Sequence, residues 1–390
     1  MTCEITPSAT GIVEQLLSDA VTKRASDVHI EPHQDGLNIR LRIDGLLQEH
    51  QALERAKTNA IIARIKIMAG LDIGQQRLPQ DGRLKLDRPG RHPQEFRVSS
   101  CPTLFGEKLV LRHIDHLSTL PQLHELGMQA NQHQSLIDAI KNPWGMVLVT
   151  GPTGSGKTVT LYAALQELNQ AHRNISTIED PIEMTLPGIN QVQCHEAIGL
   201  GFANTLRTFL RQDPDVLMVG EIRDAVTAKM AIEAAQTGHL VFSSLHTHTA
   251  LATLTRLRHL GISTPDLVGA LRLVLSQSLM RKLHHCKQPD DSALAHQLLD
   301  HSKQTATQVY QARGCRQCRS GYLGRVGVFE TLPITHAVRQ TLLDTPSPES
   351  LASIDLKDGW VDLRQAAGQH VIEGISSLSE MNRITSEMMR

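Results

Sequence analysis

Two kinds of hydrophobic pattern alternate at the start of the chain. Apolar residues at helical spacing predict an amphipathic helix over residues 11–25. In the strand predicted next, every second residue is apolar: Leu37, Ile39, Leu41 and Ile43. The Asp44-Gly45 pair directly after it is a hairpin-turn signal. Helix, strand and turn in this order predict an α+β arrangement.

The same mixture continues along the chain. Helical spacing returns over residues 60–70, and a second hairpin and a further strand are predicted over 83–98 and 108–114. We therefore expect a small α+β domain at residues 1–115. The turn-rich sequence after it predicts a linker at residues 116–126.

From about Asn142 onward the pattern becomes strand followed by helix, repeated. Four short apolar runs each follow a polar or helical stretch: WGMVLVT, NISTIED, DVLMVGE and HLVFSSLHT. Parallel strands covered by helices produce this pattern, so we predict an α/β domain at residues 127–390. Beyond Ile262 we expect mostly helices, interrupted by a cysteine-bearing insert at about 281–328 and ending in a helical C-terminus.

Composition narrows the classes of partner. Lysine and arginine number 39 against 40 aspartate and glutamate, so the formal net charge is −1 and no global positive field attracts nucleic acid. Aromatic residues make up 3% of the chain, too few to form stacking platforms for single strands. We therefore expect no nucleic-acid partner.

The chain carries no sequence signal for export or for crossing a membrane. Its first residues, MTCEITPSAT, lack the basic and apolar regions of a signal peptide, and no run of 18 apolar residues occurs. Six cysteines in 390 residues do not form a disulfide framework. We expect a cytoplasmic protein that reaches any membrane through a partner.

The run GPTGSGKT follows one predicted strand and precedes a predicted helix. It fits the pattern G-x-x-x-x-G-K-[ST], whose backbone N–H groups and helix N-terminus bind phosphate. We expect ATP and Mg²⁺ here, with Lys157 reaching the β- and γ-phosphates and the Thr158 hydroxyl ligating Mg²⁺. The candidate phosphate-binding residues are Gly151, Pro152, Thr153, Gly154, Ser155, Gly156, Lys157 and Thr158.

Two acidic clusters and two histidines flank other predicted strands. Glu179 in TIEDPIE and Glu221 in DVLMVGEIRD each end a strand, where a carboxylate can hold the Mg²⁺ shell or polarise the attacking water. Glu179 is the first candidate for the general base and Glu221 the second. His239 and His246 stand at opposite ends of another strand, and a histidine in such a place is more often structural than catalytic.

Four of these motifs occur in a familiar order. GPTGSGKT, TIEDPIE, RQDPDVLMVGEIRD and TGHLVFSSLHT resemble the phosphate loop, aspartate box, second acidic motif and histidine box of the secretion ATPase superfamily. SDVHIEP, RLRIDG, RLPQDGR and GEKLVLR make the chain similar to the ATPases of type II secretion and type IV pilus assembly. The resemblance implies a RecA-like P-loop domain preceded by a smaller α+β, PAS-like domain.

The resemblance also implies roles for single residues. ATP would lie between the two domains of a subunit in a homohexamer, with Glu179 and Glu221 serving hydrolysis. His239 and His246 would sense the γ-phosphate or link the site to the moving domain. Three arginines match residues that reach the nucleotide from other segments: Arg83, Arg97 and Arg325. A guanidinium group can neutralise charge on the transferring phosphoryl group, and the alternative for each arginine is a surface salt bridge.

The cysteines depart from the family pattern. Zinc-bearing relatives carry two CxxC pairs, whereas this chain has Cys315 and Cys318 but, in RKLHHCKQP, only Cys286. His284 or His285 could complete a Cys₃His zinc site, and His284 is the better candidate because His285 is adjacent to Cys286. The alternative is a degenerate knuckle without metal.

The resemblance predicts the protein's role. We expect a ring ATPase, peripheral at the inner membrane of a bacterium, that powers assembly of type IV pili or of the type II secretion pseudopilus through platform proteins. A retraction motor, a DNA-uptake or nucleic-acid translocating ATPase, and a non-hydrolysing scaffold are the alternatives. Longer family members begin with a further domain that docks on a membrane partner, and we expect it to be absent from this chain.

Overall fold

The chain forms two compact units, Met1–Ser118 and Thr119–Arg390. The computed structural model describes residues 8–87, 93–114, 120–301, 308–318, 320–344 and 360–386. Each unit has a hydrophobic core of its own, built around one principal sheet.

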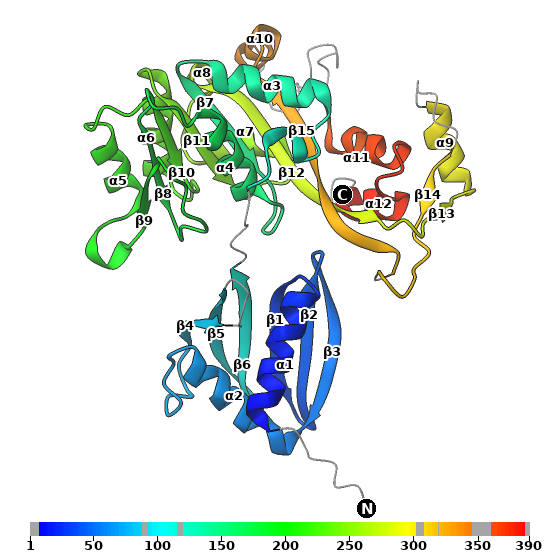
Figure 1. Ribbon diagram of the computed structural model, residues 1–390. Coiled ribbons are helices and arrows are strands. Elements are labelled where there is room, and N and C mark those ends of the chain that lie inside the picture. The colour runs from blue at the N-terminus through cyan, green and yellow to red at the C-terminus, as the bar shows by residue number, and fades with distance from the viewer. Residues whose placement is uncertain are drawn as a thin grey trace, which may run out of the picture. The chain divides into compact units, whose positions relative to one another are not determined.

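The first unit is an antiparallel sheet covered by two helices. Its elements in chain order are α1 (Ala9–Thr22), β1 (Ala25–His33), β2 (Gly36–Ile43), β3 (Leu46–Glu54), α2 (Arg55–Met68), β4 (Gln80–Leu86), β5 (Gln94–Thr103) and β6 (Gly106–Ile114). The strands lie in the order β3-β2-β1-β6-β5-β4, and α1 runs along the sheet in Figure 1.

The hydrophobic alternation of the sequence explains how this sheet is covered. Leu37, Ile39 and Leu41 are fully buried on β2, while the residues between them are partly exposed. Asp44 and Gly45 both have positive φ, at 49° and 86°, as the two-residue turn of a tightly connected hairpin requires. The predicted α+β arrangement is therefore present, and the turn of the hairpin between β4 and β5 lies outside the described residues.

The second unit contains a mostly parallel sheet of seven strands in the order β15-β12-β7-β11-β10-β8-β9. The strands are β7 (Gly145–Thr150), β8 (Ile175–Glu179), β9 (Asn190–Gln193), β10 (Val216–Val219), β11 (Leu240–Leu245), β12 (Leu271–Leu283) and β15 (Tyr322–Pro333). Each neighbouring pair is parallel except β12 and β15, which are antiparallel.

Helices cover both faces of this sheet. They are α3 (Ala130–Lys141), α4 (Lys157–Leu168), α5 (Phe202–Phe209), α6 (Ala225–Gln236), α7 (Ala250–His259), α8 (Thr264–Ala270) and α10 (His336–Asp344), with two 3₁₀ turns at Leu123–Glu125 and Glu196–Ile198. Along β7, Met146 and Leu148 join the core beneath α5, α6 and α7, whereas Val147 and Val149 join the core beneath α3 and α4. Both faces of the strands are buried, as in other α/β sheets.

The sequence predicted mostly helices beyond Ile262. Helices are present at residues 264–270, 336–344, 363–372 and 378–385, but the prediction is wrong for residues 271–283 and 322–333, which form strands. These strands, β12 and β15, are the two longest arrows in Figure 1, and they pair from Leu273–Pro333 to Leu283–Tyr322. The cysteine-bearing insert lies between them and contains β13 (Gln288–Pro289), α9 (Ala293–His301) and β14 (Tyr310–Gln311).

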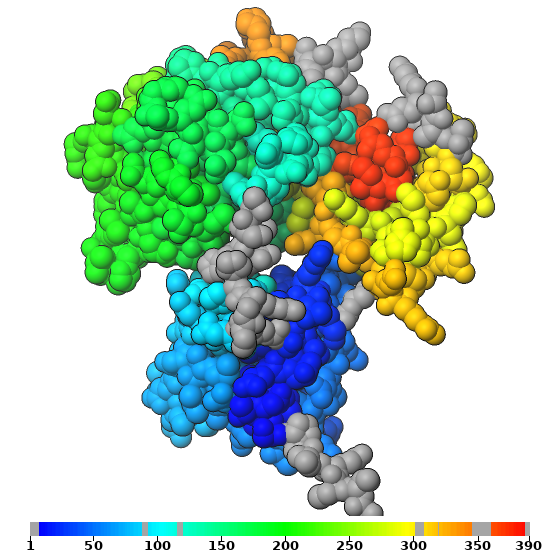
Figure 2. All heavy atoms as spheres, viewed as in Figure 1, coloured from blue at the N-terminus to red at the C-terminus, as the bar shows by residue number. Residues whose placement is uncertain are grey.

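The C-terminal helices α11 (Leu363–Ile372) and α12 (Leu378–Thr385) form a small third core on the ends of β12 and β15. Met280, Val326 and Val328 are buried in this core. Figure 2 shows the insert, in yellow and orange, beside these red helices on the surface of the second unit.

The expected linker also needs correction at its second half. Leu123 is 3% exposed in the core beneath α3 and α4, and the carbonyl of Leu126 accepts a hydrogen bond from Gly327 N at 3.0 Å. Residues 120–126 therefore belong to the second unit.

Candidate functional site

The phosphate-loop motif occupies the turn between β7 and α4. Because β7, β8, β10 and β11 are parallel, the residues that follow these strands lie at one edge of the sheet. This edge carries the motif, the acidic residues after β8 and β10, and His246 after β11. The strand–loop–helix context expected around GPTGSGKT is present.

Strand β12 lies against this loop, and its close approach is the reason that two positions of the motif need glycine. A Cβ atom at Gly151 would lie 2.2 Å from the carbonyl oxygen of Gln277, and one at Gly156 would lie 2.9 Å from Gln277 Nε2. Both glycines also have positive φ, at 143° and 90°. Gln277 Oε1 in turn accepts a hydrogen bond from Thr160 Oγ1 at 2.8 Å, which fixes α4 against β12.

The polar groups of the loop fit a polyphosphate with its magnesium ion. Lys157 Nζ donates to the carbonyls of Gly151 and Pro152 at 2.8 and 3.1 Å, so its ammonium group lies over the loop. Burial lowers the pKa of Lys157, and the negative charge of Glu221 acts in the opposite direction. The buried Ser155 Oγ has no hydrogen-bond partner among the described residues, while Thr158 is exposed in the first turn of α4.

Glu221 lies at the same edge, after the end of β10. Its carboxylate forms an ion pair with Arg223, and its Oε2 is 3.3 Å from His246 Nε2. Arg223 also approaches Asp180 of the other acidic cluster, with 3.5 Å between Nη1 and Oδ2. The Glu221 side chain remains 14% exposed, so water can reach the carboxylate.

Glu179 has different surroundings. It is 3% exposed, and its Oε1 accepts hydrogen bonds from Thr177 Oγ1 at 2.6 Å and Gln191 Nε2 at 3.1 Å. Its Oε2 accepts one from the Tyr162 hydroxyl of α4. Burial, with the charge of Glu179 as a smaller cause, raises the pKa of Tyr162 far above its usual range. This carboxylate ties β8 to α4 and β9, and the geometry favours Glu221 over Glu179 for orienting water.

The two histidines expected at the site lie at opposite edges of the sheet. His246 is beside Glu221, as described above. His239 precedes β11, so the six residues of that strand separate it from the phosphate-loop edge by about 20 Å. Its Nδ1 is 3.1 Å from the carbonyl oxygen of Ala234, in the last turn of α6. Within this unit His239 therefore has a local contact away from the phosphate loop, and its expected role in hydrolysis stays a prediction.

The arginines of the first unit form a row across its sheet. Arg83 of β4 is directly opposite Arg97 of β5, which is opposite Arg112 of β6. Cross-strand partners share a face, and all three side chains are exposed. The positive charge of Arg112 is balanced by an ion pair with Asp27, with 3.0 Å between Nε and Oδ1. Like charges on facing positions are unfavourable unless an anion joins them, so this row is a candidate anion-binding surface.

Arg325 lies on the part of β15 that continues past the phosphate loop. Phe329 is paired with Gln277, and Arg325 is four residues beyond it, about 13 Å further along the strand. The arginine is exposed there, opposite Arg281 of β12.

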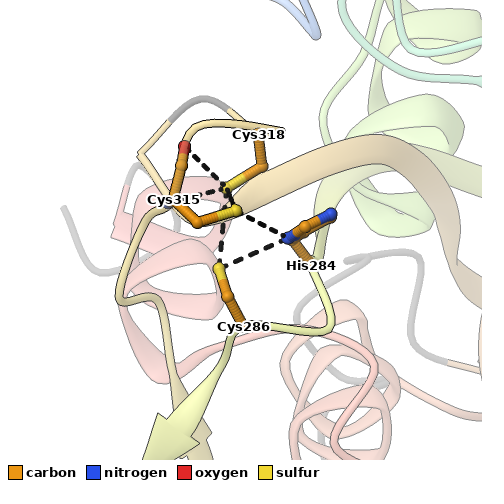
Figure 3. Close-up of side chains that lie close together, drawn as sticks. All are labelled: His284, Cys286, Cys315 and Cys318. Atoms are coloured by element: carbon orange, nitrogen blue, oxygen red, sulfur yellow. Dashed lines mark hydrogen bonds between the residues drawn. The ribbon is translucent and has the colours of Figure 1, made fainter.

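A cluster of metal-ligating side chains lies at the base of the insert between β12 and β15. His284, Cys286, Cys315 and Cys318 offer ligand atoms that all lie within 4.8 Å of one another. Figure 3 shows the imidazole Nδ1 of His284 directed at the sulfur atoms of Cys286 and Cys315, at 3.3 and 3.6 Å. Cys318 Sγ is 3.6 Å from each of the other two sulfur atoms.

These separations fit tetrahedral zinc. Zinc–sulfur bonds of about 2.3 Å and zinc–nitrogen bonds of about 2.0 Å place neighbouring ligand atoms about 3.5 to 3.8 Å apart. The backbone N–H of Gln317 donates to Cys315 Sγ at 3.4 Å, and this hydrogen bond is the main cause that lowers the pKa of the Cys315 thiol. A thiol that ionises readily is suited to bind a metal.

Known proteins resemble this chain over most of its length. The family model described as "Type II/IV secretion system protein" matches residues 6–383. The type IV pilus assembly ATPase PilB of Acinetobacter baylyi is 43% identical over 381 residues, which cover 96% of this chain and 66% of the relative. PilB of Pseudomonas aeruginosa is 44% identical over 379 residues, which cover 96% of this chain and 67% of the relative. The type II secretion system ATPase E of Vibrio cholerae is 44% identical over 379 residues, which cover 96% and 75%.

The chain belongs to the type II/IV secretion system protein family. It spans about two thirds of the length of the two PilB relatives. The family resemblance expected from the four motifs is thereby confirmed.

Solved structures of related ATPases share the fold of this family member. The Legionella pneumophila ATPase DotB matches with a TM-score of 0.72 and 22% identity, covering 98% of this chain and 97% of that one. The pilus retraction motor PilT with bound ADP matches with a TM-score of 0.62 and 24% identity, covering 95% and 96%. The RecA-like class predicted for the second unit is therefore confirmed. No helix among the described residues has the length and apolar character needed to cross a bilayer.

Several residues at the candidate site were missed by sequence reasoning. Arg223 stands two residues after Glu221, but nothing in the sequence shows that it pairs with both acidic clusters. Tyr162 occupies a buried helix position, where an aromatic residue ordinarily serves only packing. Gln277 could not be identified as a neighbour of the phosphate loop, because the sequence predicted helix where β12 lies.

Proposed function

We propose that this protein hydrolyses ATP at the carboxyl edge of its seven-stranded sheet. The observation that carries the proposal is the convergence of Lys157, Glu221 and His246 after three parallel strands. A phosphate-binding loop beside a solvent-accessible carboxylate is the arrangement that hydrolysis of a phosphoanhydride needs.

Each residue has a role in this proposal. The phosphate loop holds the β- and γ-phosphates, with Lys157 neutralising their charge and Thr158 ligating Mg²⁺. Bound Mg²⁺ supplies charge neutralisation on the phosphate oxygens. Glu221 orients and polarises the attacking water, while His246 holds the carboxylate in place from the neighbouring strand. Glu179 supports the site by fixing α4, and Arg83, Arg97 and Arg325 contribute positive charge to the nucleotide.

The proposed work of this ATPase is assembly of type IV pili or of the type II secretion pseudopilus. Relatives that are 43% and 44% identical carry these two activities in their names. The likeness to the retraction motor is 24% in sequence and supports the fold alone. We propose a homohexamer in the bacterial cytoplasm that acts on platform proteins at the inner membrane.

We also propose a structural zinc ion held by Cys286, Cys315, Cys318 and His284. Its place at the base of the insert would join the end of β12 to the start of β15. His284 N already donates to Gly321 O at 2.8 Å across this base.

The proposed activity is tested by phosphate release from the purified chain with ATP and Mg²⁺. Lys157→Ala should abolish turnover and leave the melting temperature nearly unchanged, because it removes a phosphate contact at a loop and not a core residue. Lys141→Ala, at the exposed end of α3, is the matched control and should keep full turnover. Turnover of the Lys157 variant at the wild-type rate would remove the phosphate loop from the mechanism. Stimulation by DNA would favour the translocase alternative.

A further inference from the structure

Strand β15 carries a buried acidic side chain that neither the motifs nor the proposed mechanism uses. Glu330 is 2% exposed. Its Oε2 accepts a hydrogen bond from Ala250 N, the first residue of α7, at 3.0 Å. Its Oε1 accepts one from Trp360 Nε1 at 3.3 Å. A buried carboxylate costs considerable free energy, so its two donors need an explanation.

The Ala250 contact fastens the loop that carries His246. This loop, residues 246–249, connects β11 to α7 and is held at two further points. The carbonyl of His248 accepts a hydrogen bond from Ser276 Oγ at 2.8 Å. The hydroxyl of Thr247 is 2.7 Å from that of Thr253, which donates to Thr150 Oγ1 at 3.3 Å, directly before the phosphate loop. Glu330 is therefore the anchor at the end of the loop where α7 begins.

The Trp360 contact reaches the segment before the C-terminal helices. Residue Val361 exchanges two backbone hydrogen bonds with Thr331, at 2.9 and 3.1 Å, beside Glu330. Asp362 then caps α11 by accepting a hydrogen bond from Gln365 N at 2.8 Å. One carboxyl group thus joins the His246 loop on one side to the start of the C-terminal helices on the other.

We infer that Glu330 is a positioning residue for hydrolysis: it holds the start of α7, and through that loop it holds His246 against Glu221. This inference rests on the proposed ATPase function and adds a residue that touches neither nucleotide nor water. It also gives the C-terminal helices a direct connection to the catalytic edge, through Trp360.

The ionisation of Glu330 provides a signature for this role. Burial raises the pKa of Glu330 to about 7, while the hydrogen bonds from Ala250 and Trp360 act against the rise. Asp362, which caps α11, raises it further, and His246 and His248 are the titratable residues of the adjoining loop. The ionised carboxylate accepts from both donors, whereas the protonated group has one oxygen occupied by its own hydrogen. Turnover should therefore fall as the pH decreases through about 7.

Stability should depend on pH in the opposite direction. An acid whose pKa is raised by folding binds its proton more tightly in the folded chain, so its contribution to stability is complete below its ordinary pKa of 4.5 and is lost as the pH rises through about 7. The ionised carboxylate, which positions the His246 loop, is thus the form in which the folded chain is less stable. As the pH rises through about 7, turnover should increase and stability should decrease.

Tryptophan fluorescence tests the titration without relying on activity. The chain has two tryptophans, so Trp144→Phe leaves Trp360 as the single emitter. Its emission should change with pH around a midpoint near 7, and adding Glu330→Gln should abolish the change. A transition that persists in the double variant would overturn the assignment to Glu330.

Steady-state kinetics tests the positioning role. Glu330→Gln should lower kcat about tenfold with KM within about twofold, and should remove the acid limb of the pH profile. Trp360→Phe removes one donor and keeps the Ala250 contact, so it should lower kcat less than Glu330→Gln does. It keeps the inference testable if the Glu330 variant fails to fold. Glu373→Gln removes a half-exposed carboxylate after α11 and should change nothing. An unchanged kcat and pH profile in a folded Glu330 variant would overturn the inference while leaving the ATPase intact. Absence of turnover in the wild type would instead contradict the proposed function.

Discussion

At the scale of single residues, the two strand-end glutamates illustrate how surroundings separate similar side chains. Glu179 is the last residue of β8, Glu221 follows the neighbouring parallel strand β10, and sequence alone favoured Glu179 as the general base. Glu179 accepts three hydrogen bonds and is 3% exposed, whereas Glu221 stays accessible beside His246 and in the field of Lys157. A carboxylate already saturated by protein donors has little capacity left to orient water.

This difference predicts opposite outcomes for two matched variants. Glu221→Gln should retain ATP binding and lose turnover by about 10²- to 10³-fold, because the amide keeps the shape but cannot polarise water. Glu179→Gln should lower the free energy of unfolding by about 1 to 3 kcal/mol, since an amide N–H₂ would face one of its present donors. Turnover, nucleotide affinity and chemical denaturation measured together distinguish the two. Loss of turnover in the Glu179 variant alone would restore the original order of candidates.

At the scale of secondary-structure elements, the sequence predicted those strands whose burial produces a clear hydrophobic pattern along the chain. Alternation in β2 and the short apolar runs of β7, β8, β10 and β11 are direct consequences of which faces are buried. Strand β12 was missed because its core is buried on both faces and contains leucine and methionine, which also favour helices. That error also hid Gln277, the residue that forms the wall of the phosphate loop.

The metal cluster depends on this same pair of strands. Its four ligands come from segments about thirty residues apart, which the pairing of β12 with β15 brings together. The sequence favoured His284 over His285 as the fourth ligand because His285 is adjacent to Cys286, and the folded loop agrees with that choice. His284 Nδ1 lies within 3.6 Å of two sulfur atoms, while the His285 ring lies against that of His284 at an interplanar angle of 44°, with 3.8 Å between centroids.

Adjacent histidines therefore provide a matched test of the zinc site. The purified chain should contain one zinc ion, which His284→Ala should lose and His285→Ala should retain, as measured by metal analysis. Loss of zinc should also lower hydrogen-exchange protection in residues 284–301 and 308–318 without affecting β7 or β11, because the ligands close only the insert. Equal zinc content in both variants, or none in the wild type, would contradict the Cys₃His assignment.

At the scale of the whole molecule, the two units contribute different kinds of group to the proposed activity. The second unit holds the phosphate loop and the water-orienting carboxylate, and the first presents Arg83, Arg97 and Arg112 in one exposed row. Sequence motifs identified Arg83 and Arg97 separately. Their alignment with Arg112 follows from strand register, which the sequence did not determine.

If this row serves hydrolysis, removing one arginine should affect the transition state more than the bound nucleotide. We expect Arg83→Ala and Arg97→Ala each to lower turnover by about 10²-fold while nucleotide affinity stays largely intact, as for loss of one preorganised donor to developing charge. Both variants should keep the oligomeric state of the wild type, which we propose to be a hexamer, because one exposed side chain is a small part of a subunit interface.

Lys85→Ala is the matched control for these variants. Lys85 lies two residues after Arg83 on the same face of β4, where its Nζ is 2.8 Å from Glu95 Oε1, and its side chain is 67% exposed. Its loss removes the same charge from the same surface and should leave turnover unchanged, since exposed ion pairs contribute little. Turnover, nucleotide affinity and sedimentation of all three variants decide the matter. If both arginine variants turn over like Lys85→Ala, these two arginines of the first unit take no part in hydrolysis.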